Sequence, residues 1–444
     1  LDNDITISTS HPSSGNVTFN GNWHTIYNKN GYKEGGASSQ IIVIYGKANI
    51  SNLWIDSCEV SGKGNHGITF SGQNAEGTVS NLWGKNAYNF TVHPRNGWQE
   101  NNLGGGSILT YENGASGTIK NCGFYNNDGA SIYLENAGNI TISGCNIADS
   151  SSGIAASNCK KLEIKETQVN ANRNSDVPHS SWGSNGIVTV NTDTVITDSW
   201  IYSNQTGIIN SGKTVWLYND NKDICTRIHD NTVGINNAGS VLHFNGYIYQ
   251  NSLDGVQNSG FYAIAEGNFD NNKRDGINNS KDATFEKNGG NIYSNKGSGI
   301  ANHGGTVTIR NGGDIRSNGD SGIYNNGTLT IDGWNNIYSN KYGISNNGTV
   351  TMNSGDIHDN TDYGVFNSNT FTMNNGSIYS NNYGFYNEGT AYVKGGTIHS
   401  NTHDGIRNAG NFDISGGTIK NNEYGVANGI YDGNRGNING SLNM

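Results

Sequence analysis

Short apolar segments alternate with glycine and asparagine along most of this chain. In the C-terminal half each unit holds three such segments, of the forms Gly-Ile-x-Asn, Thr-x-Thr-Ile and Ile-x-x-Asn. Each segment alternates apolar and polar positions over four or five residues and then ends at Gly or Asn. That pattern is typical of short β-strands separated by tight turns. The hydrophobic pattern therefore predicts three short strands per unit.

The unit repeats at a nearly fixed length. The glycine that opens the first segment recurs every 20 or 21 residues, at Gly322, Gly343, Gly364, Gly384, Gly405 and Gly425. A unit this short cannot bury its own apolar face, so neighbouring units must stack and share a core. Stacking makes each strand the parallel partner of its equivalent in the next coil. We expect an all-β, right-handed parallel β-helix of about 17 coils with three short strands per coil, right-handed like most parallel crossovers.

Three parts of the chain differ in regularity, although we expect them to form one continuous solenoid. Residues 1–40 are expected to form the opening or capping coils. Residues 41–206 are expected to form β-helix with two long turn insertions, at 85–106 and 171–185. Residues 207–444 are expected to form regular repeats of 20–23 residues.

Asparagine recurs at fixed places in these units. It follows the apolar residue of the first segment by two positions, as at Asn346 and Asn367, and that of the third segment by three, as at Asn340 and Asn360. Asn tolerates left-handed backbone conformations at bends, and stacked amides bond to one another. Glycan contact is the alternative role. Because the asparagines recur whatever their neighbours are, we expect hydrogen-bonded ladders at the corners of the coils.

Composition narrows the function classes. The chain has 64 Gly but 3 Pro and no Gly-X-Y period, which excludes collagen. Its 33 % hydrophobic and 10 % aromatic residues are too many for a disordered chain. The net charge of -10 argues against nucleic acid as a partner, and no apolar run is long enough to predict membrane insertion. The cysteines lack zinc-type spacing. Cys122 and Cys145 share one slot in successive repeats and are expected to be small core residues, with a disulfide as the alternative.

Candidate chemistry gathers where the repeat is interrupted. The turn after the third segment is long in two coils, and two coils between them have short versions of the same turn. Because the turns stack, the long ones should form walls and the short ones a floor. Aromatic rings, Arg, His and carboxylates in a concave place suit a sugar site, although these rings could instead pack the turns onto the helix. The candidate ligand-binding residues are Tyr88, His93, Arg95, Trp98 and Glu100 in the first long turn, Tyr125, Asp128 and Asp149 in the short turns, and Arg173, Asp176, His179 and Trp182 in the second.

Catalysis at the same place is an open alternative. A glycoside hydrolase needs two carboxylates ~5–9.5 Å apart, which Asp128 and Asp149, one coil apart, could supply. A lyase needs a base and often calcium held by clustered carboxylates. If the protein is an enzyme, we expect Asp128, Asp149, Arg173 and His179 to be catalytic. Otherwise we expect no cofactor and no metal, with calcium the one exception left open.

The runs Gly-Gly-Thr-Ile-His-Ser-Asn (395–401) and Gly-Gly-Asp-Ile-Arg-Ser-Asn (312–318) resemble adhesin-type repeats. They are similar to the repeats of polymorphic outer-membrane proteins and of large cell-wall proteins of gut bacteria, over roughly residues 200–428. The N-terminal part resembles the pectate-lyase-like β-helix superfamily, which includes lyases, hydrolases and non-catalytic glycan binders. The resemblance implies a secreted or cell-surface bacterial protein that meets carbohydrate. The paired-Asp and Gly-His-Gly motifs of galacturonases and the Asp-Pro-His-Asp motif of lyases are not found in their expected order.

These observations favour a non-catalytic adhesin that presents a carbohydrate-binding patch on a rigid β-helix. Its expected partner is an extracellular polysaccharide or a host glycan, with end-to-end or side-by-side self-association as a further expectation. A polysaccharide lyase or glycoside hydrolase acting at the same loop-flanked groove is the first alternative. A structural fibre or surface-layer subunit is the second.

Overall fold

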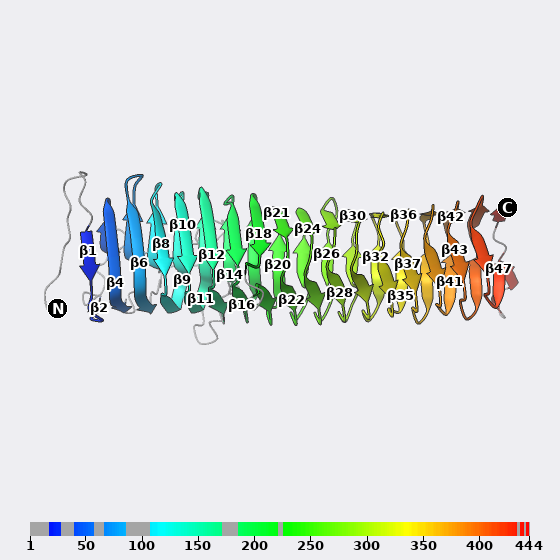
Figure 1. Ribbon diagram of the computed structural model, residues 1–444, viewed down its shortest axis with the longest axis horizontal. Helices are drawn as coiled ribbons and strands as arrows, with labels where there is room; N and C mark the ends of the chain where they lie inside the picture. Colours follow the sequence, from blue (N-terminus) through cyan, green and yellow to red (C-terminus); the bar gives the residue numbers. More distant parts are fainter. Residues whose placement is uncertain are drawn as a thin grey trace. The chain divides into compact units, whose positions relative to one another are not determined.

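The computed structural model describes residues 17–27, 40–56, 66–85, 107–170, 185–220, 225–432, 436–438 and 441–443. Within these ranges every regular element is a β-strand, and equivalent strands of successive coils pair in parallel (Figure 1). The fold is the parallel β-helix that the repeat predicts, with about 15 turns against the expected 17. The chain divides into two compact units, residues 1–232 and 233–444, here called unit 1 and unit 2.

Unit 1 is built from coils of unequal length, in which some strands run through a corner of the coil. Its strands are β1 (Val17–Asn20), β2 (Thr25–Tyr27), β3 (Gln40–Ile44), β4 (Lys47–Asp56), β5 (His66–Ser71), β6 (Glu76–Lys85), β7 (Ser107–Glu112), β8 (Ser116–Lys120), β9 (Gly123–Glu135), β10 (Asn139–Ser143), β11 (Asn146–Ser157), β12 (Lys161–Lys165), β13 (Gln168–Asn170), β14 (Asn185–Val190), β15 (Thr194–Thr197), β16 (Trp200–Tyr202), β17 (Thr206–Ser211), β18 (Thr214–Tyr218) and β19 (Arg227–His229). The core is a set of stacked apolar columns. One of them joins the fully buried residues Ile68, Leu109, Ile132, Ile154, Ile187 and Ile208 in register.

Unit 2 repeats one three-strand coil from β20 (Val233–Asn237) to β47 (Tyr424–Asn428). A typical coil has β35 (Tyr342–Asn346), β36 (Thr349–Met352) and β37 (Asp356–His358). The inward residues of the first strands again form a column with no exposed surface, and burying each apolar side chain contributes about 1.5–3 kcal/mol. In order, this column is Ile235, Val256, Ile277, Ile300, Ile323, Ile344, Val365, Phe385 and Ile406.

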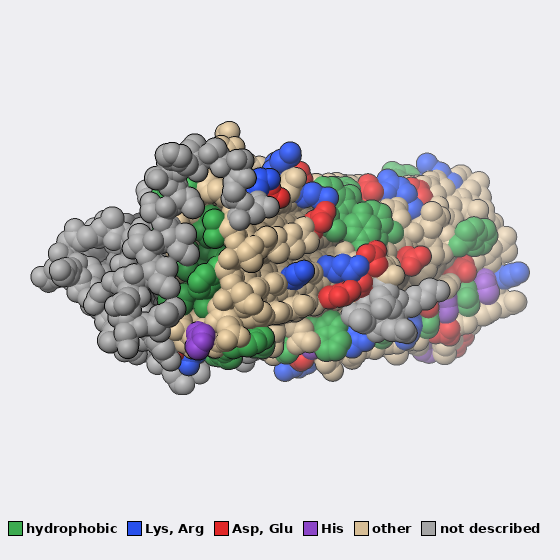
Figure 2. Space-filling model, turned by 60° about the vertical axis from the view of Figure 1, so that its left-hand side comes forward, with side chains coloured by type: hydrophobic (Ala, Val, Ile, Leu, Met, Phe, Trp, Pro, Cys, Tyr) green, Lys and Arg blue, Asp and Glu red, His purple; other side chains and the backbone are tan. Residues whose placement is uncertain are grey.

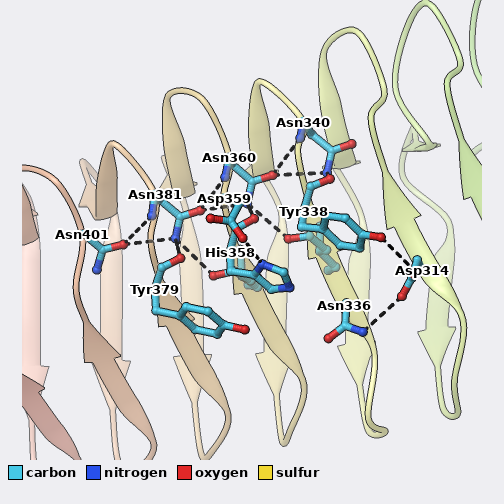
Figure 3. A network of polar contacts seen from close by, with 12 residues as sticks. Asp314, Asn336, Tyr338, Asn340, His358, Asp359, Asn360, Tyr379, Asn381 and Asn401 are labelled. Carbon is cyan, nitrogen blue, oxygen red and sulfur yellow. Dashed lines mark hydrogen bonds and ion pairs between the residues drawn. The ribbon is translucent and has the colours of Figure 1, made fainter.

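Hydrogen-bonded asparagines form two ladders in unit 2, as the sequence predicts, one at the ends of the first strands, where Asn346 donates to Asn367 at 2.7 Å, and one after the third strands. The side-chain oxygen of Asn360 accepts bonds from the backbone N and Nδ2 of Asn340, at 3.1 and 3.2 Å. Asn381 does the same for Asn360, and Asn401 for Asn381 (Figure 3). These amides are almost completely buried, so they stabilise the corner and are inaccessible to a glycan. The residue that directly follows each third strand of unit 2 has a positive φ, as at Ser339 (54°) after β34 (Asn336–Tyr338).

The cysteines of the described chain are buried and free. They are Cys122, Cys145, Cys159 and Cys225, whereas Cys58 lies outside the described residues. Cys122 and Cys145 each place Sγ near the backbone oxygen two residues earlier, at 3.2 and 3.4 Å. In the next coil Thr167 makes the same contact with its hydroxyl, at 2.9 Å. The prediction of small stacked core residues is thus confirmed for this pair, and the disulfide alternative is wrong.

The outward face of the second strands in unit 1 carries paired charges. Figure 2 shows one face of the molecule on which acidic and basic side chains lie next to one another among uncharged polar ones. Among the pairs of this unit, Lys161 Nζ lies 2.5 Å from Glu163 and Lys213 Nζ lies 3.9 Å from Asp193. Exposed pairs of this kind contribute at most about 1 kcal/mol each. Since these charges are mutually balanced, this strand face is not the best candidate for a ligand site.

Candidate functional site

Most of the site residues expected from the sequence lie outside the described residues. These are Tyr88, His93, Arg95, Trp98 and Glu100 of the first long turn and Arg173, Asp176, His179 and Trp182 of the second. Tyr125 and Asp149 are described, and Asp128 is described in its backbone alone, within β9. The two long turns directly follow β6 and β13 in the chain. Both strands belong to the same sheet face of unit 1, and the candidate site is built from that face.

Two columns of outward side chains make up this face, which we call the Trp face. They come from the third strand of each coil, because the residues on either side of an inward Ile, Val or Phe point outward. The parallel register aligns Trp54, Trp83, Gly123, Asn146, Gln168 and Trp200 in one column and Asp56, Lys85, Tyr125, Ala148, Asn170 and Tyr202 in the other.

A pair of stacked indoles forms one end of the Trp face. The ring centroids of Trp54 and Trp83 are 5.7 Å apart, with an interplanar angle of 22°. The next position in the column is Gly123, where an added Cβ would lie 2.3 Å from Cε3 of Trp83. Glycine is therefore what lets the Trp83 ring lie over the following strand. Beside the indoles, Lys85 Nζ is 3.3 Å from the Asp56 carboxylate, so the charges at this end are paired.

Aromatic rings also form the other end. The Arg227 guanidinium lies over the Trp200 ring, 5.3 Å from its centroid. In the neighbouring column Tyr202 stacks on His229, with centroids 5.2 Å apart and rings nearly parallel at 3°. The indole nitrogen of Trp200 is buried without a hydrogen-bond partner in the described structure. This end thus offers apolar ring surface, whereas the indole nitrogen itself is not accessible.

Amide side chains occupy the middle of the face. Asn146 and Gln168 are exposed, and Nδ2 of Asn170 lies 3.4 Å from Oδ1 of Asn146. Tyr125, the one described aromatic residue of the predicted site, is half-buried at the edge of this region. Amides both donate and accept hydrogen bonds, so this floor can bond to hydroxyl groups that act either as donors or as acceptors. The arrangement is a polar floor between two aromatic ends.

The corner beside this floor holds Asp149. Its φ is 49°, and Asn126, Ser203 and Asp230 adopt the same left-handed conformation at equivalent corners. Short polar residues tolerate this conformation best, which by itself explains an Asp at this position. Partial burial raises the pKa of the Asp149 carboxyl above its usual value. Asp149 therefore lies next to the floor, but Asn126 and Ser203, which are not acids, have the same backbone role.

Beneath this corner a small polar cluster stands where the Asn ladder would be. Nδ2 of Asn127 donates to the Ser131 hydroxyl at 2.9 Å, and the hydroxyls of Ser131 and Ser150 are 2.7 Å apart. All three residues are completely buried. The register between β9 and β11 shifts between Ser150 and Ser152, and Asp128 lies in the extra length of β9 that this bulge accommodates. Asp128 is thus at a bulge, a feature that redirects side chains near binding sites.

Sequence reasoning missed the aromatic ends of the face. Trp54 and Trp83 lie in regular strands and not in the long turns, and they are separated by a coil longer than the 21-residue unit. The signal that could have found them is an outward Trp recurring in the same Leu-Trp slot of two successive coils, in Asn-Leu-Trp-Ile and Asn-Leu-Trp-Gly. No group of His, Cys, Asp or Glu residues within the described ranges has the arrangement of a metal site.

One comparison with known proteins supports the fold, and neither of two comparisons identifies an activity. No helix among the described residues is long and apolar enough to cross a membrane. No curated protein matches the chain significantly. Residues 41–222 match the family model described as a right handed beta helix region, which includes most of the Trp face and agrees with the hand expected from the sequence.

Proposed function

We propose that the protein is a non-catalytic carbohydrate-binding adhesin, secreted or displayed on a bacterial cell surface. The observation that carries this proposal is the Trp face, with its amide floor between aromatic ends. From Trp83 to Trp200 the column advances four coils, or ~19 Å at the spacing of neighbouring strands. A short stretch of polysaccharide lying along the coil axis would span that distance. Its pyranose rings could contact the aromatic side chains while its hydroxyls bond to the amides.

The charges on the face favour binding over catalysis. Asp56 is paired with Lys85, and the floor itself is made of neutral amides. Hydrolysis by the usual mechanisms needs two carboxylates held at a set separation. A hydrolase or lyase using Asp128 and Asp149 is the alternative to be tested, with an extracellular polysaccharide or a host glycan as substrate instead of ligand.

Glycan-array binding and reducing-end release test the proposal together. We expect the full chain to bind one class of polysaccharide without releasing new reducing ends. Trp83→Ala should weaken this binding about tenfold, since an aromatic contact contributes about 0.5–1.5 kcal/mol beyond its buried area. Tyr45→Ala, which removes an exposed ring outside the face, is the matched control and should bind normally.

Two results would reject the proposal. Turnover that Asp149→Asn abolishes would establish the enzyme alternative. Equal binding by Trp83→Ala, Trp54→Ala and the unaltered protein would show that the Trp face is not the binding surface.

A further inference from the structure

The turn between the second and third strands of one unit 2 coil departs from its neighbours. In this coil β33 (Thr328–Ile331) and β34 (Asn336–Tyr338) are joined through Gly333-Trp334-Asn335. The equivalent places in neighbouring coils hold Asn-Gly-Gly (311–313), Asn-Ser-Gly (353–355) and Asn-Asn-Gly (374–376). A large aromatic residue thus stands in a turn that these neighbouring coils build from glycine, serine and asparagine.

Trp334 is the most exposed large apolar side chain of the described chain, at 86 %. By contrast, the Trp side chains of the Trp face in unit 1 are half-buried. An indole in water gains nothing from the hydrophobic effect, whereas burying it would be worth several times the value of a methyl group. Trp334 therefore does not contribute to folding through burial.

A second side chain in the same turn is energetically unfavourable for folding. The side chain of Asn335 is almost completely buried, and neither its oxygen nor its nitrogen has a hydrogen-bond partner in the described structure. Such an unpaired buried amide costs about 1–3 kcal/mol. The turn also requires glycine before Trp334, because a Cβ at Gly333 would lie 1.2 Å from the backbone oxygen of Arg310. In a unit whose ladder amides are hydrogen-bonded, a turn that breaks local rules without a structural gain indicates a functional site.

A row of polar side chains runs beside Trp334 through successive coils. Asn353 donates from Nδ2 to Oδ1 of Asp332 at 2.5 Å, and Asn374 donates to Oδ1 of Asn353 at 2.7 Å. Asp332 is two residues before Trp334, and all three polar residues directly follow the last residue of a second strand. The contacts between these side chains are exposed to solvent. An apolar ring and a row of donors and acceptors are thus presented on one turn surface.

This combination selects the chemistry of the ligand. An apolar protein patch or a lipid chain would cover the indole but would also remove water from the carboxylate and from the amide atoms that the row leaves exposed, which is unfavourable. A pyranose has an apolar ring face and a rim of hydroxyls, so it matches both parts of the surface. We infer that Trp334 is the stacking platform of a second carbohydrate site, whose hydroxyl partners are Asp332, Asn353 and Asn374. The inference rests on the proposed function for its ligand class but uses a separate site in unit 2.

The test is fluorine NMR of the full chain labelled with 5-fluorotryptophan. The Trp334 signal is assigned with Trp334→Phe, and those of Trp54 and Trp83 with the corresponding Phe variants. The probes are short oligosaccharides of glucose, xylose, mannose and galacturonic acid, titrated separately. We expect at least one probe to shift the Trp334 signal in a saturable way. Asn353→Ala, which keeps the Trp334 signal, should shift its saturation curve to higher concentrations of that probe, because one hydroxyl partner is lost.

Tyr424→Ala, which removes another exposed ring of unit 2, is the matched control and should leave the titration unchanged. If no probe moves the Trp334 signal while the Trp54 and Trp83 signals respond, the inference is wrong and the proposed function stands. If only the Trp334 signal responds, the inference stands and the Trp face is wrongly assigned. If none of the three signals moves with any probe, both proposals are overturned for these sugars.

Discussion

Units 1 and 2 share one coil plan but differ at the corner that follows the third strand. In unit 2 that corner holds an asparagine in coil after coil, and each amide bonds to the next, as from Asn340 to Asn401. In unit 1 the equivalent places around Asn127 and Ser150 hold a short cluster of mixed side chains, and ladder bonding appears in the last coils, from Asn204 to Asn231. A ladder requires the same residue at the same height in every coil, so it fixes the position of this corner although the rungs are 20 to 27 residues apart. Where the ladder is absent, the turn is free to lengthen, and the two long insertions occur in unit 1.

The comparison separates two ways of presenting a ligand site on a β-helix. In unit 1 the Trp face uses the flat outward surface of several strands, next to turns of variable length. In unit 2 the length of the turn is nearly constant, and the departure is a change of residue at one turn, Trp334. Regular stacking therefore leaves room for function either by insertion or by substitution at a corner. Four predictions sharpen this contrast, in order of expected effect.

The largest effect is expected from breaking the ladder. Asn360→Ala removes bonds to Asn381, to two backbone oxygens and from Asn340. Because it leaves buried polar groups unpaired, it should lower the free energy of unfolding by about 3 kcal/mol or more. Ser150→Ala in unit 1 should cost about 1 kcal/mol, since a single hydroxyl is lost. Denaturant unfolding measures the loss of unfolding free energy in both variants. Equal losses would show that the ladder does not distinguish the units.

A pH effect of similar size is expected from the core of unit 2. His243 is buried, with Nδ1 3.0 Å from the Tyr262 hydroxyl, and burial lowers its pKa to about 4. Since the folded-state pKa lies below the unfolded value of about 6.5, protonation favours unfolding. The contribution of His243 to stability should fall as pH drops from about 6.5 to 4, by ~3 kcal/mol in total. Burial raises the pKa of Asp275 to about 6, which has the opposite sign and offsets a comparable amount between pH 6 and 4, so the His243 contribution is read from the difference between the unaltered protein and a variant without this histidine.

His243→Gln keeps a hydrogen-bonding side chain but does not titrate in this range. As pH drops from about 6.5 to 4, the unfolding free energy of His243→Gln should rise relative to that of the unaltered protein, by ~3 kcal/mol in total. Identical pH profiles for the two proteins would contradict the assignment to His243.

The third prediction concerns the Trp face. Gly123→Ala places a methyl group where the Trp83 ring lies, so the ring must move. We expect about a tenfold loss of glycan affinity at this face with ~1–3 kcal/mol of destabilisation, as for overpacking. Signals from Trp334 should not change. Gly46→Ala, where a Cβ has open space, is the control substitution in the same unit. If Gly123→Ala binds the glycan with unchanged affinity, the position of the Trp83 ring does not matter for binding.

The smallest effect is expected at the corner acid. Asp149→Asn replaces a residue with positive φ by another that tolerates it, so stability should change by no more than about 0.5 kcal/mol. If Asp149 is a corner residue and not an acid catalyst, glycan binding should also stay the same. A large change in binding or turnover at constant stability would restore the catalytic interpretation.

The local sequence pattern predicts much of the fold, but it predicts less of the candidate site. The spacing of Gly343 and Gly364 and the recurrence of Asn340 and Asn360 predict coil length, parallel register and the corner ladder. The reason is that in unit 2 a coil nearly equals a sequence period. The position of Asp149 at a corner could be predicted for the same reason. The residues of the two long turns lie outside the described ranges, so their prediction as ligand-binding residues stays a prediction.

The sequence by itself determined which segments are strands, that they stack in parallel, and that stacked asparagines bond to one another at a corner. All of these follow from a short repeat that can bury its apolar residues only against its neighbours. Only the tertiary structure decided that Trp54, Trp83 and Trp200 share a face, and that Trp334 stands in water beside Asp332 and Asn353. Unit 1 coils differ in length, so the distance along the chain does not reveal which outward side chains become neighbours. Exposure, likewise, depends on what the adjacent coils place around a residue and not on the residue itself.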